Sequence, residues 1–383
     1  MKTGVQRIYS YGKGLDSGAC PGPDPGFAGM TEKRLFKLFY EAINFNFHKV
    51  KPLRFFDLKD RPREKEKKMF YPWTDFFHLG VVVPAFYPAV KERKGPVLEV
   101  VRKLAADPFF QAMEFSGAED PAVRRELIDV ARSSGKSRVF AGGSYCRLGQ
   151  NNLHDLDDAK RQKALRNAEK IIDEAIDYGC AILYVMGFEA PAAPERPKAL
   201  EKFAGSLAAL SDYARRKNPS SPLTIGVENF YLLGEVPFLI GPTRELAQIL
   251  RDLRRDHPNV GLTFDTSHIL QLQEDLPATY LAVQDVIAHI HLSNCLIKDK
   301  SSPFYGDKHP PYGMPGSEIG IPELAAFLRV LKEAGHFSRT YATGKPVLSL
   351  EVIPPAGQTP EAILEGAKEA FRQAWENFQK LST

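Results

Sequence analysis

The sequence predicts a (β/α)8 (TIM) barrel with an N-terminal extension. From about residue 77 onward, short apolar segments alternate with longer segments whose apolar residues recur at helical spacing. Strands that alternate with helices indicate a parallel sheet, and eight such units in about 300 residues are typical of a (β/α)8 barrel. A doubly wound open sheet is the alternative, but no G-x-G-x-x-G motif follows the first predicted strand. We therefore expect the barrel.

The predicted strands are short apolar runs, and the predicted helices lie between them. In chain order the strands are FHLGVVVPAF (77–86), FFQAMEFSG (109–117), SRVFAGGSY (137–145), CAILYVMGF (180–188), PLTIGVENF (222–230), NVGLTFDTSH (259–268), VIAHIHLSN (286–294) and PVLSLEVIP (346–354). Helices are expected at 95–107, 157–179, 198–217, 243–256 and 360–381. The last of these helices would close the eighth unit.

Residues 1–75 differ in composition from residues 76–383, which we predict to be the catalytic barrel. The first segment combines a stretch rich in Gly, Pro and Asp (11–30), a helical pattern (31–45) and a charge run (59–70). It carries 15 Lys or Arg against 9 Asp or Glu, a net charge of +6, whereas the remainder has a net charge of −2. Enzymes of nucleic acids usually spread basic residues around the active face. Nucleic acid is therefore not the expected partner.

The sequence also indicates the compartment. No stretch approaches the roughly 18–20 consecutive apolar residues of a membrane span, and the N-terminus lacks the apolar core of a secretory signal. Cys20, Cys146, Cys180 and Cys295 are far apart and form no C-x-x-C pair, which argues against a zinc ribbon or a disulfide scaffold. We expect a soluble, cytoplasmic protein without a membrane partner, and a homo-oligomer is compatible with this sequence.

Polar residues end four consecutive predicted strands. They are Glu228 in GVEN, Asp265 in FDTSH, His291 in HIHLSN and Glu351 in LSLEV. Active sites of (β/α)8 barrels lie at the C-terminal ends of the strands, so these side chains are candidates for one site. For Asp265 there is a second interpretation, because a short carboxylate can cap the helix that follows.

The four residues together suggest a metal centre. Two Glu, one Asp and one His provide oxygen and nitrogen donors that suit a single Mn²⁺, Mg²⁺, Co²⁺ or Zn²⁺ ion. Without a cation, three converging carboxylates would repel one another. We therefore expect one divalent ion at this rim.

Strand alternation adds a layer beneath the four candidates. Residues two positions earlier point to the same side of a strand, which places Gly226, Thr263, His289 and Ser349 in the interior. Small or polar residues there leave room and hydrogen-bond partners for the ligands above. We predict that His289 is an interior histidine with hydrogen-bond partners, rather than a ligand.

The motifs GVEN, FDTSH, HIHLSN, DKHPPYGMPGSEIG (307–320) and LSLEV, in this order, resemble the xylose-isomerase-like barrel superfamily. That superfamily holds sugar and sugar-phosphate isomerases and epimerases, and also endonuclease IV. The resemblance covers roughly residues 77–380. It implies that Glu228, Asp265, His291 and Glu351 are metal ligands and that His268 is an auxiliary imidazole.

The loop 307–320 fits both branches of the superfamily. In endonuclease IV the Asp and His of the similar loop bind a further zinc, which Asp307 and His309 could do here; in isomerases the loop covers the substrate. Endonuclease IV also needs histidines at the ends of earlier strands. Gly142, Gly143 and Met186 stand at those places here, so a trinuclear site is not expected.

The favoured function is a metal-dependent isomerase or epimerase of a sugar or sugar derivative. The metal would stabilise an enediolate, and Glu228 and Glu351 would act as the two acid/base groups on opposite sides of it. The alternatives are a lyase or dehydratase of a keto-sugar or cyclitol, a phosphodiesterase of the endonuclease IV kind, and a barrel that only binds its ligand.

Substrate contacts are open to two interpretations. Arg147 and Asn151 follow the third predicted strand, and Lys298 follows the seventh. They could hold a phosphate, a carboxylate or sugar hydroxyls, or they could be solvated loop residues. The expected substrate is a small carbohydrate.

Overall fold

The computed structural model describes residues 71–143, 146, 151–230 and 238–381, and it shows an eight-stranded parallel barrel. The strands are β1 (His78–Val81), β2 (Ala112–Phe115), β3 (Ser137–Ala141), β4 (Ile182–Met186), β5 (Thr224–Glu228), β6 (Val260–Asp265), β7 (Ile287–Ser293) and β8 (Val347–Glu351). All eight predicted strands are confirmed, and so is the fold class.

The strand order closes the sheet almost completely. Paired strands run β1-β8-β7-β6-β5-β4-β3-β2, and every pairing is parallel. At the remaining seam, β1 approaches β2 through a hydrogen bond of 2.8 Å from the Gln111 amide to the Leu79 carbonyl oxygen. A parallel bridge joins Val82 to Glu114 at the same seam.

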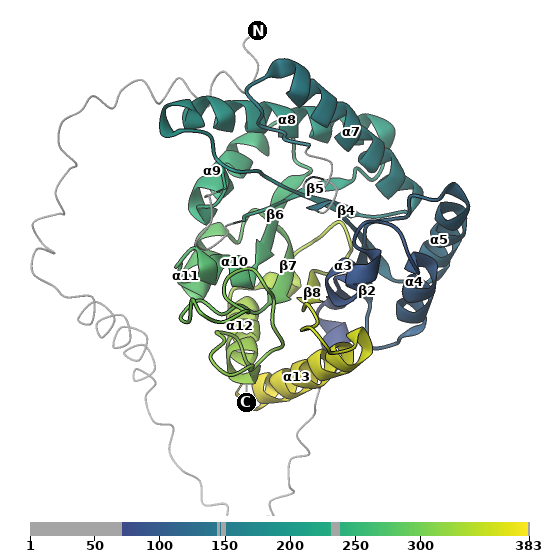
Figure 1. Ribbon diagram of the computed structural model, residues 1–383, viewed down its shortest axis with the longest axis vertical. Coiled ribbons are helices and arrows are strands. Elements are labelled where there is room, and N and C mark those ends of the chain that lie inside the picture. Colours follow the sequence, from purple (N-terminus) through teal and green to yellow (C-terminus); the bar gives the residue numbers. More distant parts are fainter. Residues whose placement is uncertain (1–70, 144–145, 147–150, 231–237, 382–383) are drawn as a thin grey trace, which may run out of the picture. The chain divides into compact units, whose positions relative to one another are not determined.

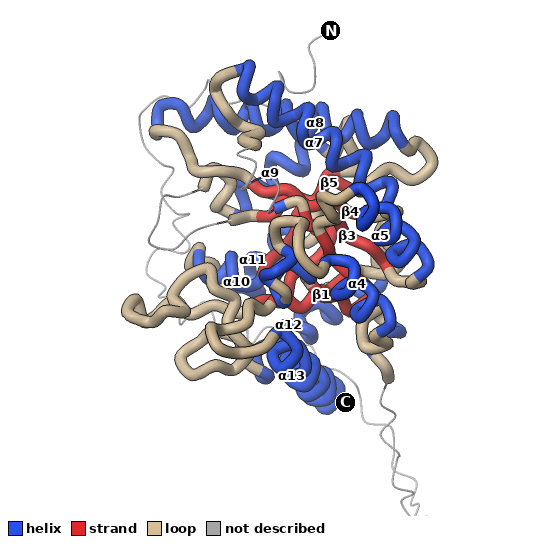
Figure 2. The backbone as a smooth tube through the Cα atoms, turned by 45° about the vertical axis from the view of Figure 1, so that its right-hand side comes forward, coloured by secondary structure: helices blue, strands red, loops and turns tan. Residues whose placement is uncertain are grey.

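Helices surround the strands (Figures 1 and 2). They are α3 (Val83–Phe86), α4 (Val97–Ala106), α5 (Pro121–Ser133), α7 (Asp158–Asp177), α8 (Arg196–Lys217), α9 (Thr243–Leu253), α10 (Thr266–Gln271), α11 (Leu276–Val283), α12 (Ile321–Glu333) and α13 (Pro360–Leu381). Short 3-10 turns are η2 (Trp73–Asp75), η3 (Pro88–Val90), η4 (Ala193–Glu195) and η5 (His336–Ser338). The five helices expected from the sequence correspond to α4, α7, α8, α9 and α13.

The helices follow from apolar spacing and from capping. On α4 the buried residues are Val97, Val100, Val101 and Leu104, which form one face at helical spacing. The Asp157 carboxylate caps α7 by accepting hydrogen bonds from two backbone amides of its first turn. Each helix can therefore bury an apolar stripe against the outside of the barrel.

The barrel interior is filled in layers. One part is a mostly apolar cluster of Ala112, Val139, Ala141, Ile182, Tyr184 and Val347. Glycines on the other strands leave room for polar neighbours: a Cβ at Gly226 would lie 2.6 Å from Thr263 Oγ1. The predicted inward orientation of Gly226 and Thr263 is thus confirmed.

We expect Gly226→Ala to destabilise the protein by about 1–3 kcal/mol, because the added methyl group overpacks the barrel interior. Urea unfolding would measure this change. The matched control is Gly205→Ala on α8, where an added Cβ has no neighbour within 4 Å. That variant should gain about 0.5–1 kcal/mol, because alanine favours the helix. Equal stability of the two variants would contradict the packing argument.

The described chain begins against the barrel. The Trp73 ring packs edge-on against Phe109 and Phe371, with ring centroids 5.1 and 5.5 Å away, and its Nε1 donates to Gln111 Oε1. Residues 1–70, most of the predicted extension, lie outside the described residues. No helix in the described part of the chain is both long and apolar enough to cross a membrane.

Candidate metal centre

The four candidate ligands converge at the C-terminal ends of β5 to β8. One donor atom from each of Glu228, Asp265, His291 and Glu351 lies within 4.8 Å of the others. His291 Nδ1 is 2.9 Å from Glu228 Oε1, 3.1 Å from Glu351 Oε2 and 3.8 Å from Asp265 Oδ2. Three of the side chains are buried, and that of Glu351 is 14% exposed. The structure therefore brings together the set that the sequence suggested.

The two oxygens of Asp265 face different partners. Oδ1 accepts hydrogen bonds from the amides of Ser267 and His268 at 2.8 and 2.9 Å, as the N-cap of α10. It also accepts from the hydroxyls of Ser267 and Ser293 at 2.7 and 2.6 Å. Oδ2 is buried and has no hydrogen-bond partner among the described residues. Capping and metal ligation are thus compatible, because each uses a separate oxygen.

The donor set fits a divalent cation. Besides Asp265 Oδ2, Glu351 Oε2 makes no hydrogen bond of suitable geometry with the described residues, although it lies 3.1 Å from His291 Nδ1. Buried polar atoms without partners are costly, and carboxylate oxygens with one imidazole nitrogen are suitable ligands for such an ion. The closeness of these groups shifts their pKa values. Burial lowers the pKa of His291, but the carboxylates of Glu114 and Glu351 outweigh this effect and raise the pKa well above the usual range. For Glu228, burial raises the pKa, and this effect exceeds the lowering caused by His291.

His268 lies beside this set. Its Nδ1 donates to the Asn229 carbonyl oxygen at 2.9 Å, and its Nε2 is 3.1 Å from Asp307 Oδ1. Nδ1 is 3.9 Å from Glu228 Oε1 and 3.8 Å from Asp265 Oδ1. Burial lowers the pKa of His268, but Asp265 and Asp307 more than offset this and raise it to about 10.

The loop after β7 places Asp307 and His309 next to His268. His309 Nε2 is 3.0 Å from Asp307 Oδ1, and the His309 carbonyl oxygen accepts from the Ile353 amide just beyond β8. The donor atoms of Asp265, His268 and His309 form a second group within 4.8 Å. His309 therefore adjoins the first group through Asp265, and Asp307 contacts the imidazoles of both His268 and His309.

The other predicted contacts lie elsewhere. Lys298 Nζ pairs with Glu318 Oε2 at 2.7 Å, and the lysine side chain is 77% exposed. This placement matches a solvated loop residue. Arg147 lies outside the described residues. Asn151 is buried, and its Oδ1 accepts a hydrogen bond from Asn167.

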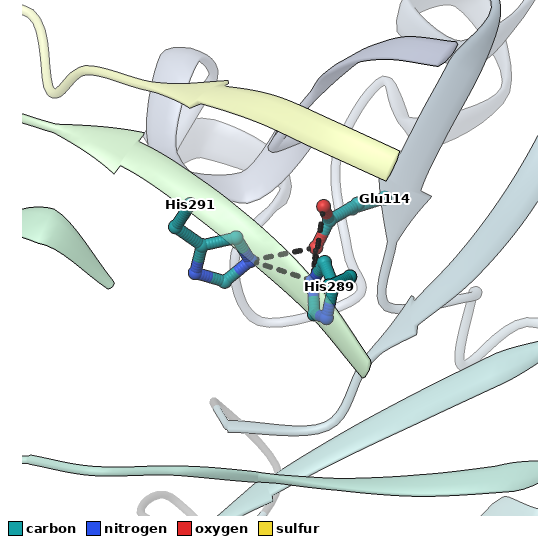
Figure 3. Close-up of side chains that lie close together, drawn as sticks. All are labelled: Glu114, His289 and His291. Atoms are coloured by element: carbon teal, nitrogen blue, oxygen red, sulfur yellow. Dashed lines mark hydrogen bonds and ion pairs between the residues drawn. The ribbon is translucent and has the colours of Figure 1, made fainter. Parts of the chain in front are cut away.

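Glu114 on β2 is a residue that the sequence analysis missed. It is fully buried, and its Oε2 lies 2.9 Å from His291 Nε2 and 3.3 Å from His289 Nε2 (Figure 3). His289 is also fully buried, and its Nδ1 lies 3.3 Å from Thr263 Oγ1, so it has partners within the interior as expected. The sequence feature that could have identified Glu114 is the single carboxylate within the apolar run AMEF (112–115).

The end of β3 has no room for a side chain at Gly142. A Cβ there would fall well inside van der Waals contact of the Tyr184 carbonyl oxygen. A histidine at this position would require the backbone to move. Close packing against the Tyr184 backbone therefore explains why position 142 is a glycine, and this position provides no imidazole.

The comparisons with known proteins agree with this architecture. Residues 102–376 match the family model described as xylose isomerase-like TIM barrel. The chain is similar to the crystal structure of a D-tagatose 3-epimerase-like protein, with 18% identity, a TM-score of 0.60 and coverage of 80% of this chain and 100% of that chain. It is also similar to the structure of L-ribulose 3-epimerase, with 16% identity, a TM-score of 0.58 and coverage of 80% of this chain and 97% of that chain.

A third similar structure is that of IOLI protein with a binding zinc atom, at 16% identity and a TM-score of 0.58, covering 79% of this chain and 99% of that chain. No curated protein matches the sequence. At these identities the structural likeness shows a shared fold.

Proposed function

Because the chain belongs to the xylose isomerase-like TIM barrel family, we propose that it is a divalent-metal-dependent isomerase or epimerase of a sugar or sugar derivative. The observation that carries this proposal is the convergence of Glu228, Asp265, His291 and Glu351 with two carboxylate oxygens left without hydrogen-bond partners in the described chain. The epimerase-like protein and the L-ribulose 3-epimerase among the similar structures support a carbohydrate substrate. The zinc atom in a third supports a metal ion.

These four residues would hold one divalent ion, such as Mn²⁺, Mg²⁺, Co²⁺ or Zn²⁺. When bound, the ion supplies electrostatic stabilisation for the negative charge that develops on substrate oxygens as a C–H proton leaves. Asp265 contributes an oxygen whose position is fixed in advance, because the other oxygen is held by four hydrogen bonds. Such preorganisation lowers the cost of assembling the site.

Glu228 and Glu351 would transfer the proton. Their oxygens approach His291 Nδ1 from β5 and β8, at 2.9 and 3.1 Å, so the two carboxylates can face a substrate from different sides. One removes the proton from the carbon next to the carbonyl group, and the other returns a proton. Return to the same carbon gives an epimer, and return to the neighbouring carbon gives the isomer.

His268, Asp307 and His309 would bind the substrate. The two imidazoles are buried and Asp307 is partly exposed; burial lowers the pKa of His309, but Asp307 and Glu351 outweigh it and raise the pKa to about 9. Protonated imidazoles in this position can donate hydrogen bonds to sugar hydroxyls or to a phosphate. Arg147 remains a further candidate, whereas the Glu318 ion pair of Lys298 favours a solvated loop residue.

We also propose that residues 1–75 form an extension to a catalytic barrel at 76–383 and that the protein is cytoplasmic. Cys146, Cys180 and Cys295 are free and buried, as expected for thiols in a reducing compartment. Burial raises the pKa of Cys146 to about 11, so this thiol stays protonated and unreactive.

A substrate screen with Mn²⁺ present tests the function. The panel holds ketoses, keto-acids and one duplex with an abasic site. We expect at least one ketose to be epimerised or isomerised, and to exchange its α-hydrogen with D₂O. Loss of water from a substrate would support the lyase or dehydratase instead. Cleavage of the duplex that disappears in Glu228→Gln would support a phosphodiesterase and contradict the proposal.

A further inference from the structure

The inner nitrogen of His291 contacts a carboxylate that the proposed reaction does not use. Glu114 comes from β2 and reaches into the barrel interior, where its Oε2 lies 2.9 Å from His291 Nε2. Figure 3 shows Glu114 pointing at the two histidines of β7, with dashed lines to both. Both Glu114 and His291 are fully buried. A carboxylate in such a place is costly unless its charge is balanced and hydrogen-bonded.

The protons of this cluster can be assigned from the contacts. If His291 Nδ1 binds a cation, it carries no proton, so the proton of the neutral ring is on Nε2. That N–H can donate to Glu114. His289 Nε2 lies 3.3 Å from the same carboxylate oxygen and 3.1 Å from His291 Nε2, and its Nδ1 lies 3.3 Å from Thr263 Oγ1. Two N–H groups cannot face each other at 3.1 Å, so the proton on His291 Nε2 places the His289 proton on Nδ1, toward the Thr263 hydroxyl. Glu114 thus accepts from the Nε2–H of His291.

The contact with Glu114 also affects the other ring nitrogen of His291. A carboxylate that accepts a hydrogen bond from Nε2–H increases the electron density on the ring and strengthens Nδ1 as a ligand.

A second interpretation treats Glu114, His289 and His291 as a metal site of their own, since their donor atoms also lie within 4.8 Å. This would require His291 to bind ions through both nitrogens as an imidazolate. Among the described residues this group has three donor residues, one fewer than the group of Glu228, Asp265, His291 and Glu351. Hydrogen bonding to Glu114 is the simpler arrangement.

We propose that Glu114 is a positioning residue, which holds His291 with its Nε2–H toward the barrel interior and its Nδ1 toward Glu228, Asp265 and Glu351. This inference rests on the proposed metal-dependent function. It predicts that Glu114 sets the metal affinity without touching the metal or the substrate. Partners of this kind typically contribute about 10–100-fold to affinity.

The test measures metal dissociation constants in Glu114→Gln and Glu114→Leu by competition with a chelator, using Zn²⁺ on protein shown to be folded by circular dichroism. Glutamine keeps a neutral acceptor, so we expect a dissociation constant raised about 10-fold. Leucine removes the acceptor, and the increase should approach about 100-fold. The glutamine variant should thus partly rescue the loss seen with leucine.

The matched control is Glu174→Gln. Glu174 on α7 is another buried carboxylate, paired with Arg93 at 2.6 Å and outside the candidate metal-ligand groups. Its replacement should lower thermal stability and leave the metal dissociation constant unchanged. A role of Glu114 in stability alone would make the Glu114 variants behave like this control, and that result would overturn the inference.

Nuclear magnetic resonance of the imidazole nitrogens in the zinc-loaded wild type gives an answer even if the Glu114 variants do not fold. We expect His291 to carry its proton on Nε2. A proton on Nδ1, or two zinc ions per chain of which Glu114→Gln loses one, would overturn the inference. Wild-type protein that binds no divalent ion would overturn the proposed function as well. Binding that Asp265→Asn abolishes and the Glu114 variants retain would overturn the positioning role alone.

Discussion

Asp265→Asn is expected to lose most of its bound divalent ion while keeping its fold. The Oδ1 position of Asp265 accepts four hydrogen bonds from donors, so an asparagine must place its oxygen there and its NH2 group at the Oδ2 position. An amide NH2 cannot ligate a cation. The reduction in affinity should exceed the about 10–100-fold effect of an outer-shell partner. Metal analysis of the purified variant, with circular dichroism as the check on folding, measures it.

Asp275→Asn is the control for this variant. Asp275 is also an N-cap aspartate, which accepts from the Ala278 amide at the start of α11, away from the metal ligands. Its replacement by asparagine keeps a good cap and should leave the metal content unchanged. If Asp265→Asn keeps its metal as this control does, Asp265 is a helix cap and not a ligand.

The barrel and the convergence of the four candidate ligands could be predicted, because both depend on position along single strands. Strand alternation places Asp265 and Thr263 on one side of β6, and parallel strands bring their C-terminal ends to one face of the barrel. The structure confirms the strands and brings the four side chains together. The sequence left two interpretations of Asp265, a helix cap or a metal ligand. In the structure Oδ1 caps α10, and Oδ2 is left without a hydrogen-bond partner among the described residues, so one role does not exclude the other.

The partners of the site depend on contacts across the barrel or along loops, which single-strand patterns do not contain. Glu114 is 177 residues from His291 in sequence, and the two side chains come into contact only because β2 and β7 both point residues into the barrel interior. Lys298 was an open candidate for substrate binding, but its ion pair with Glu318 depends on the path of the loop after β7. The contact of His268 with Asp307 depends on the same loop.

The glutamine variants of Glu228 and Glu351 should each stop exchange of the substrate's α-hydrogen with D₂O, or leave it possible for one epimer only. Glutamine retains an oxygen that can ligate a metal, but its amide cannot take up a proton at neutral pH. Loss of a general acid/base group typically lowers a rate by about 10²–10⁴-fold. Exchange is measured by mass spectrometry or proton NMR on a ketose from the screen, and it is expressed per bound metal ion. This separates loss of the base from loss of the metal.

Glu126→Gln is the control for these two variants, because Glu126 on α5 forms an exposed ion pair with Arg102 and is outside the candidate ligand set. It should exchange the α-hydrogen at the wild-type rate. The expected asymmetry is the sharper test: removal of the proton from one face of the substrate needs one carboxylate, and the epimer with the opposite configuration at that carbon needs the other. Glu228→Gln and Glu351→Gln should therefore fail with opposite epimers. Full exchange in both variants at normal metal content would mean that the proton is carried by a different base, and the two glutamates would then be ligands only.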